Sequence, residues 1–185
     1  ATGWAQGELS ELGRKQCLEL KEILKDRQGG QHFDAVFCSD LKRAVESARI
    51  VFGNKITPDE RLRECNYGDL NQKPEHEHRR FEKGNNVINE GYPHGESLKE
   101  VEKRMRAFLQ SIYAQYKGKH IAIVAHRAPQ LALEVLLLGK TWPQALKEDW
   151  RLQEPKQWKP GWAFRMAALL QEMPTAEELI AKTIT

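Results

Sequence analysis

The sequence has no apolar run that approaches the ~18 residues needed to cross a bilayer. It opens without the basic and apolar leader that directs secretion. Its three cysteines are widely spaced and odd in number, which excludes a disulfide framework and a CxxC metal motif. These absences predict a soluble cytoplasmic protein whose cysteines are small buried apolar side chains.

No sign of charge predominates either, because 29 Lys and Arg residues stand against 26 Asp and Glu residues, a net charge of +3. So small an excess predicts no nucleic-acid partner and no membrane surface as a partner. Hydrophobic residues make up 40% of the 185 residues, and no repeat or low-complexity tract is visible. We therefore expect one domain over residues 1–185 with a sizeable core.

Helical spacing of apolar residues alternates along the chain with short apolar runs. Ser39 is expected to cap the second helix, Ser97 and Glu100 form a capping box, and Pro129 is expected to open a later helix. We expect helices near 11–27, 41–51, 75–83, 98–116, 131–138 and after Thr175, and extended pieces at 35–38, at Ile56, at 121–125 and at 162–169.

This alternation predicts an α/β fold, a three-layer α/β/α sandwich with a mostly parallel central sheet. The polar stretch 59–94, interrupted by glycine and proline, predicts a lid-like excursion. Ligands bind beyond the carboxyl ends of parallel strands. Three segments bring polar residues to such an edge, namely 39–43, 64–67 and 126–127.

Four residues of these segments suit phosphate chemistry: Arg43, Glu64, His126 and Arg127. An arginine fork matches a phosphate bidentately, and a histidine at a strand end can donate to the same oxyanion. A carboxylate beside the phosphate can act as a general acid toward a leaving oxygen. The set therefore favours phosphoryl transfer.

Three of these four residues also have a simpler interpretation. Arg43 could be a solvated charge on a helix, and His126 could be a satisfied core histidine. Glu64 could be a loop carboxylate that pairs with Arg61 or Arg63.

Residues 75–78, Glu-His-Glu-His, have side chains that bind metals, but a polar lid usually presents such residues to solvent. No additional ligand cluster follows elsewhere in the sequence. We therefore predict no metal, no cofactor and a solvated surface at this segment.

Five blocks stand in order along the first 139 residues. They are ATGW with LSELGRKQ (1–4 and 9–16), FDAVFCSDLKRA (33–44), RLRECNYGD (61–69), YPHGES (92–97) and VAH (124–126). The middle three resemble the SSDLxRA, LxExxxGxxxG and PGGES blocks of the histidine phosphatase (phosphoglycerate mutase-like) superfamily. The first resembles the segment that follows that family's catalytic strand, and the last resembles the strand that carries its second histidine.

The resemblance implies a phosphoglycerate mutase-like fold and a metal-free phosphomonoester hydrolase that works through a phosphohistidine. Arg43 would clamp the phosphate, Glu64 would be the general acid, and His126 would donate to the phosphoryl group. Arg127, where many members carry glycine, would also contact the phosphate.

The resemblance also implies residues that bind the rest of a phosphorylated small-molecule substrate. Thr2 and Gly3 would line the pocket mouth, and Tyr67 would lie near the remote end of the substrate. A phosphoglycerate or phosphosugar mutase is the alternative within the same chemistry. A non-catalytic relative that binds a phosphorylated ligand is the alternative outside it.

The family's nucleophilic histidine lies in an Arg-His-Gly motif at the end of the first strand, and no such motif occurs in this sequence. We expect that an upstream stretch carries it and that the chain as given has essentially no turnover. The missing strand is central in the family, so the unpaired strand edges predict a chain that is either poorly stable or a homo-oligomer.

Overall fold

The computed structural model describes residues 1–26, 32–152, 163–164 and 166. Its helices are α1 (Glu11–Asp26), α2 (Lys42–Phe52), α3 (Glu75–Gly84), α4 (Leu98–Tyr113), α5 (Arg127–Leu138) and α6 (Trp142–Lys147). Its strands are β1 (Ala35–Cys38), β2 (Thr57–Pro58) and β3 (Ile121–Val124), and short 3₁₀ turns lie at Glu60–Leu62, Gly68–Leu70 and Trp150–Leu152. The expected helix after Thr175 and most of the expected strand at 162–169 lie outside the described residues.

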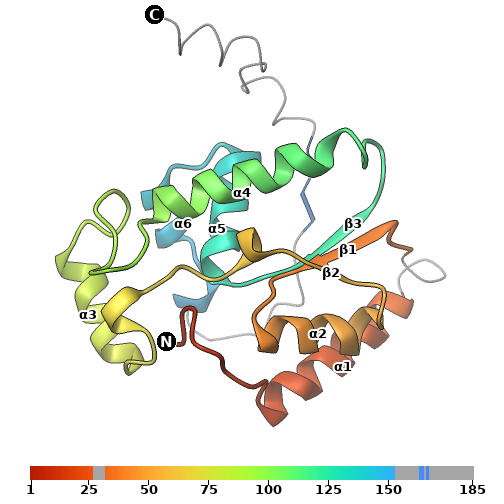
Figure 1. Cartoon of the computed structure of the whole chain (residues 1–185), viewed down its shortest axis with the longest axis horizontal. Helices are drawn as coiled ribbons and strands as arrows, with labels where there is room; N and C mark the ends of the chain where they lie inside the picture. The colour runs from red at the N-terminus through yellow and green to blue at the C-terminus, as the bar shows by residue number, and fades with distance from the viewer. Residues whose placement is uncertain (27–31, 153–162, 165, 167–185) are drawn as a thin grey trace, which may run out of the picture.

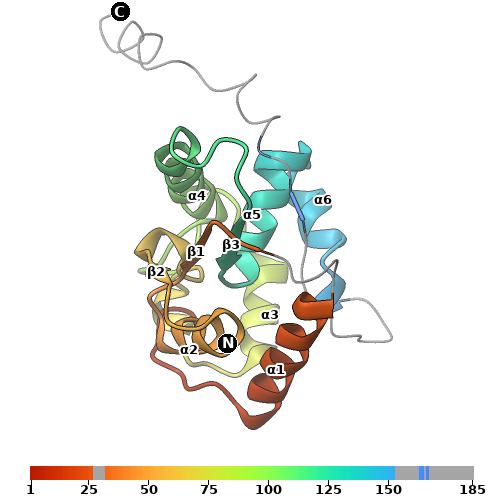
Figure 2. The same cartoon turned by 90° about the vertical axis from the view of Figure 1, so that its right-hand side faces the viewer.

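The three strands form a parallel sheet in the order β2-β1-β3. Phe37 of β1 lies opposite Thr57 on one side and Ile123 on the other. Helices α4 and α5 cover one face of the sheet, and α1 and α2 cover the other (Figures 1 and 2). This arrangement confirms the three-layer α/β/α fold that the alternation of strands and helices predicts.

The helix termini agree only in part with the sequence-based expectation. Ser97 and Glu100 form the expected capping box at the start of α4. Ser39 does not cap α2, which begins after Leu41; its Oγ instead accepts a hydrogen bond from the Leu41 amide at 3.3 Å. The serine therefore closes the turn between β1 and α2, three residues before the first residue of the helix.

Two helix starts differ from the expectation. Helix α5 begins at Arg127, two residues before Pro129, because the first turn of a helix tolerates a residue without an amide hydrogen. Helix α6 was not expected. Thr141 and Gln144 form a capping box at its start, a signal that the sequence does contain.

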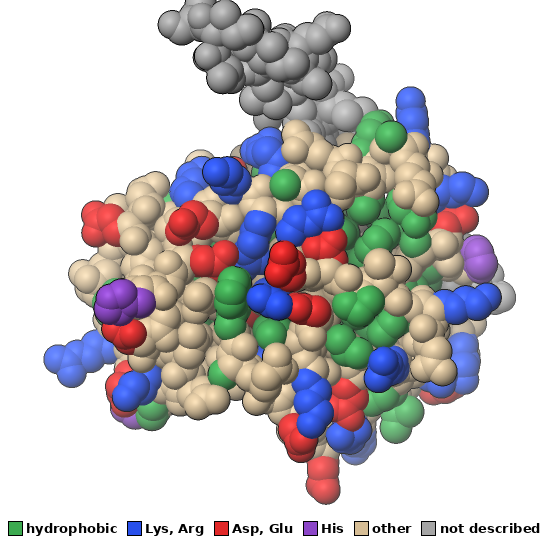
Figure 3. All heavy atoms as spheres, in the orientation of Figure 1, with side chains coloured by type: hydrophobic (Ala, Val, Ile, Leu, Met, Phe, Trp, Pro, Cys, Tyr) green, Lys and Arg blue, Asp and Glu red, His purple; other side chains and the backbone are tan. Residues whose placement is uncertain are grey.

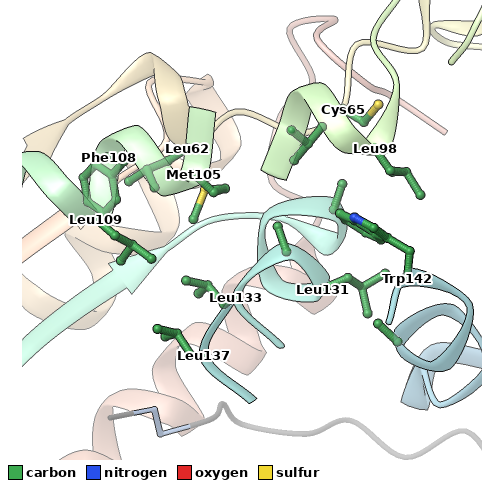
Figure 4. Close-up of a cluster of buried hydrophobic side chains, with 14 of the residues drawn as sticks. Leu62, Cys65, Leu98, Met105, Phe108, Leu109, Leu131, Leu133, Leu137 and Trp142 are labelled. Carbon is green, nitrogen blue, oxygen red and sulfur yellow. The ribbon is translucent and has the colours of Figure 1, made fainter. Parts of the chain in front are cut away.

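The hydrophobic core lies between the sheet and the layer of α4 and α5 (Figure 4). Phe108 of α4 is fully buried and meets the ring of Phe37 edge to face, with 5.3 Å between the ring centres. The buried side chains that α4 and α5 pack against one another include Met105, Leu109, Leu131 and Leu133. This packing fixes the start of α5 relative to the ends of the strands.

The surface carries mixed charges over the face shown in Figure 3, where Lys and Arg side chains lie among Asp and Glu side chains. No helix in the described part of the chain combines the length and the apolar character that a membrane crossing requires.

Candidate functional site

The residues that the sequence predicts for the site lie in three segments at the carboxyl edge of the sheet. Arg43 lies in the first turn of α2, just after β1, and His126 lies between β3 and α5. Glu64 lies in the loop between the two 3₁₀ turns that follow β2. The N-terminal segment passes in front of these elements, and α3 lies beyond them (Figure 1).

Arg43 is half-buried, so it is not a solvated helix charge. Its Nη2 donates to the Gly3 carbonyl at 2.8 Å and its Nη1 to the Ala5 carbonyl at 3.0 Å. Burial lowers the pKa of the guanidinium, and the nearby Glu64 and Tyr67 oppose that effect. The side chain therefore joins the N-terminal segment to the start of α2 and places a cation beside Glu64.

The Glu64 carboxylate is held by backbone amides. Its Oε1 accepts from Cys65 and Ala128, each at 2.9 Å, and its Oε2 accepts from Arg127 at 3.1 Å. Two of these amides belong to the free first turn of α5, where an anion is favoured by the helix dipole. The residue is only 8% exposed, so this acid is anchored in place.

The simpler interpretation of Glu64 as a partner of Arg61 or Arg63 is wrong. Arg61 pairs with Asp59 at 2.6 Å, and Arg63 forms a two-pronged pair with Asp40. Both arginines are paired with other carboxylates, and they fix the stretch of chain that leads into Glu64.

His126 carries an unsatisfied buried atom. Its Nε2 is buried and has no hydrogen-bond partner among the residues that the structure describes. Burial lowers the pKa of His126 to about 4; Glu64 opposes this shift and Arg43 adds to it. The imidazole is therefore neutral at pH 7, and it is not the satisfied core histidine of the simpler interpretation. Such orphaned polar atoms are rare and costly, and they often mark the place of a ligand.

The Arg127 side chain is held by two carboxylates. Its Nη1 lies 3.0 Å from Glu82 on α3, and its Nε lies 2.7 Å from Asp149, a fully buried carboxylate after α6. Burial acts to lower the pKa of Arg127, but the two carboxylates outweigh it and raise the pKa. The side chain thus connects the lid-like segment to the residues that follow α6.

Gly3, expected at the pocket mouth, lies against Tyr67, expected near the remote end of the substrate. Gly3 has a φ of +51°, and a Cβ there would come within 2.9 Å of the Tyr67 ring and closer still to Asn71. Only glycine therefore fits between the N-terminal turn and these two side chains. Burial, together with Glu64, raises the pKa of the Tyr67 phenol. Thr2 is exposed beside Gly3.

The expected solvated surface at 75–78 is wrong for one residue. His78 is 4% exposed and packs on Tyr67 and Tyr92, with ring centres 4.0 and 5.1 Å away. Burial lowers its pKa, so the aromatic cluster favours the neutral form of the ring. No group of three or more metal-binding side chains is arranged around a common point in the part of the chain that the structure describes.

One residue that the sequence analysis did not single out contacts the Glu64 loop directly. Arg104 lies on α4 and donates to the Glu64 carbonyl at 2.9 Å. In α4 it stands three residues after the fully buried Val101 and four residues before the fully buried Phe108, so it lies on the apolar side of an amphipathic helix. A charged residue at such a position was the sequence signal that could have identified Arg104.

Comparison with known families gives one clear match. Residues 1–154 match the model of the histidine phosphatase superfamily (branch 1). The match therefore covers every residue of the site described above.

Individual relatives of this chain carry the names of different activities. A zebrafish (Danio rerio) fructose-2,6-bisphosphatase TIGAR B is 29% identical over 71% of this chain and 52% of its own length. A probable phosphoglycerate mutase GpmB of Yersinia enterocolitica is 31% identical over 74% of this chain and 66% of its own length. The chain thus spans about half the length of the first relative and just under two thirds of the second.

Solved structures support the same fold. A mycobacterial glucosyl-3-phosphoglycerate phosphatase superposes with a TM-score of 0.65 at 26% identity, covering 78% of this chain and 74% of that one.

Proposed function

The chain belongs to the histidine phosphatase superfamily, and from this premise we propose that it acts as a metal-free phosphomonoester hydrolase through a phosphohistidine. The observation that carries the proposal is the unpartnered, buried Nε2 of His126 beside Arg43 and Glu64. A phosphate oxygen would satisfy that nitrogen, and the Arg43 guanidinium would neutralise part of the phosphate charge.

The residues divide the chemistry as follows. Arg43 holds the phosphoryl group, and His126 donates a hydrogen bond to an oxygen whose negative charge grows in the transition state. Glu64 gives its proton to the leaving oxygen when the bond from that oxygen to phosphorus breaks. Gly3 and Tyr67 bound the side from which the rest of the substrate extends, with Thr2 at the rim.

The attacking imidazole is the one part that these residues do not supply. The 185 residues contain no Arg-His-Gly sequence, and His126 cannot both attack the phosphorus and donate to the oxygen across from the attack. We therefore propose that this chain binds phosphate but has essentially no turnover as given.

Hydrolysis is favoured over mutase chemistry by the state of Arg127. A mutase must keep and return the phosphoryl group, which calls for additional basic contacts around the substrate. The Arg127 guanidinium is already paired with Glu82 and Asp149, so it offers no free cation for that purpose.

The test has two arms. In the first, calorimetry on the 185-residue chain should detect binding of inorganic phosphate or vanadate, and p-nitrophenyl phosphate should not be hydrolysed with or without added divalent ions. Absence of binding would refute the assignment of the site.

In the second arm, the complete open reading frame that encodes this chain is expressed and assayed on a panel of phosphomonoesters. Metal-independent hydrolysis with an acid-labile phosphoprotein supports the hydrolase. An inactive protein that still binds phosphate supports the non-catalytic relative, and a requirement for a divalent ion contradicts the proposed chemistry.

A further inference from the structure

The loop that presents Glu64 has no strand or helix of its own between the two 3₁₀ turns at Glu60–Leu62 and Gly68–Leu70. A backbone of this kind keeps its conformation only where other groups bind its carbonyls and amides. The carbonyls of Arg61, Arg63 and Glu64, in and just before this loop, all accept from a single side chain on α4, Arg104.

Arg104 makes five hydrogen bonds with its guanidinium. Its Nη1 donates to the carbonyls of Arg61 and Arg63 at 2.6 and 2.7 Å. Its Nη2 donates to the Glu64 carbonyl at 2.9 Å and to Glu96 at 3.2 Å, and its Nε donates to Glu96 at 2.9 Å. A guanidinium has five N–H donors, so this number of bonds matches its full capacity.

Glu96 extends the same arrangement to the far end of the loop. Its Oε2 accepts from the amide of Asn66 at 2.8 Å as well as from Arg104. The side chains of Arg104 and Glu96 are 14% and 17% exposed, so solvent competes little for these bonds. The pair therefore fixes the backbone on both sides of Glu64.

We propose that Arg104 is a positioning residue that keeps the Glu64 carboxylate on the amides of Arg127 and Ala128, a role that rests on the proposed function of Glu64 as the general acid. The carboxylate lies 2.9–3.1 Å from those amides. A displacement of ~1 Å in a reacting group can cost about 100-fold in rate. The loop thus needs a rigid attachment to the core, and α4 provides it.

Lysine cannot replace this arginine. An ammonium group has three donors at one point, whereas the carbonyls and the carboxylate around Arg104 are spread over a planar fork. Arg104→Lys keeps the charge and most of the side-chain volume, so it changes the geometry of the bonds with little other disturbance.

The experiment follows the amides of Arg127 and Ala128 by ¹H–¹⁵N NMR and hydrogen exchange of the 185-residue chain at one fixed pH. In the parent chain both amides donate to the Glu64 carboxylate and should exchange slowly, and Glu64→Ala, which removes the acceptor, should move both signals and speed their exchange. In Arg104→Lys we expect the same movement and faster exchange at these two amides while the rest of the spectrum stays folded.

The matched control is Arg106→Lys. Arg106 lies two residues further along α4, its side chain is 39% exposed, and it pairs with Glu102 at 3.4 Å. This variant should keep the parent's signals and exchange rates at Arg127 and Ala128. Glu96→Gln, which retains the side-chain shape but weakens the pair with Arg104, should also speed exchange at the two amides, and it decides the question if Arg104→Lys does not fold.

Two results separate this inference from the proposed function. Parent-like signals and exchange rates of both amides in a folded Arg104→Lys or Glu96→Gln chain, with only a lower unfolding free energy, would show a purely structural role and overturn the inference. Phosphate binding to Arg43 and His126 is measured in parallel: its absence in the parent would contradict the proposed function, and the amide measurements would still judge Arg104.

Discussion

Replacement of Glu64 by glutamine tests whether the carboxylate is held as the structure shows. The variant keeps the shape of the side chain, and its amide oxygen can still accept from the two amides that Oε1 serves. The new NH₂ group, however, faces the amide hydrogen of Arg127, where Oε2 accepts at 3.1 Å in the parent. A donor thus meets a donor, and one buried N–H loses its partner.

The magnitude follows from two contributions. A lost bond to a charged group or an unsatisfied buried donor costs about 1–3 kcal/mol, and loss of the charge at the start of α5 costs about 0.3–1 kcal/mol. We therefore expect Glu64→Gln to lower the free energy of unfolding by about 1.3–4 kcal/mol at pH 7.

Urea denaturation at pH 7, followed by circular dichroism, measures this difference. Glu60→Gln is the matched control, because Glu60 lies in the 3₁₀ turn just before the Glu64 loop, its side chain is 75% exposed, and its ion pair with Arg63 is long, at 3.9 Å. That variant should change stability by less than about 0.5 kcal/mol, as surface substitutions generally do. If Glu64→Gln is as stable as this control, the carboxylate is not bound to the amides of α5 and the site geometry is refuted.

The further predictions concern residues around Glu64. Arg43→Ala should weaken phosphate binding by about 1.5–3 kcal/mol in calorimetry, whereas Ala at the exposed Arg49 of the same helix should leave the affinity unchanged; equal affinities in both variants would contradict the clamp. The pKa of His126 is about 4 in the folded chain against an ordinary 6.5, so the unfolded chain binds the proton first. Stability that is present above pH 6.5 is therefore lost as the pH falls toward 4, and His126→Asn should flatten that part of a stability–pH profile. Phosphate should raise this pKa in an NMR titration, because an anion favours the imidazolium, and an unchanged value would place the ligand elsewhere. Arg127→Ala should lower the unfolding free energy by about 3 kcal/mol, because it leaves the buried Asp149 with one cation fewer, and a thermal melt equal to the parent's would refute that ion pair.

The sequence alone determined the local elements and the kind of chemistry. The helix over 98–113 follows from apolar spacing and the Ser97–Glu100 capping box, and the strand at 121–124 follows from a run of β-branched residues. Arg43, Glu64 and His126 could be selected because they stand at the ends of predicted strands and within ordered motifs. Such signals depend on neighbours within a few residues, so they can be read without a structure.

Only the tertiary structure decided which charges are free and which are paired. Arg127 meets Glu82, 45 residues earlier, and Asp149, 22 residues later. Arg104 meets the Glu64 carbonyl across 40 residues of sequence. His78 became a buried ring because distant tyrosines cover it, although its neighbours in the sequence are polar. Pairings of this kind are set by how the helices pack on the sheet, which no local pattern of residues encodes.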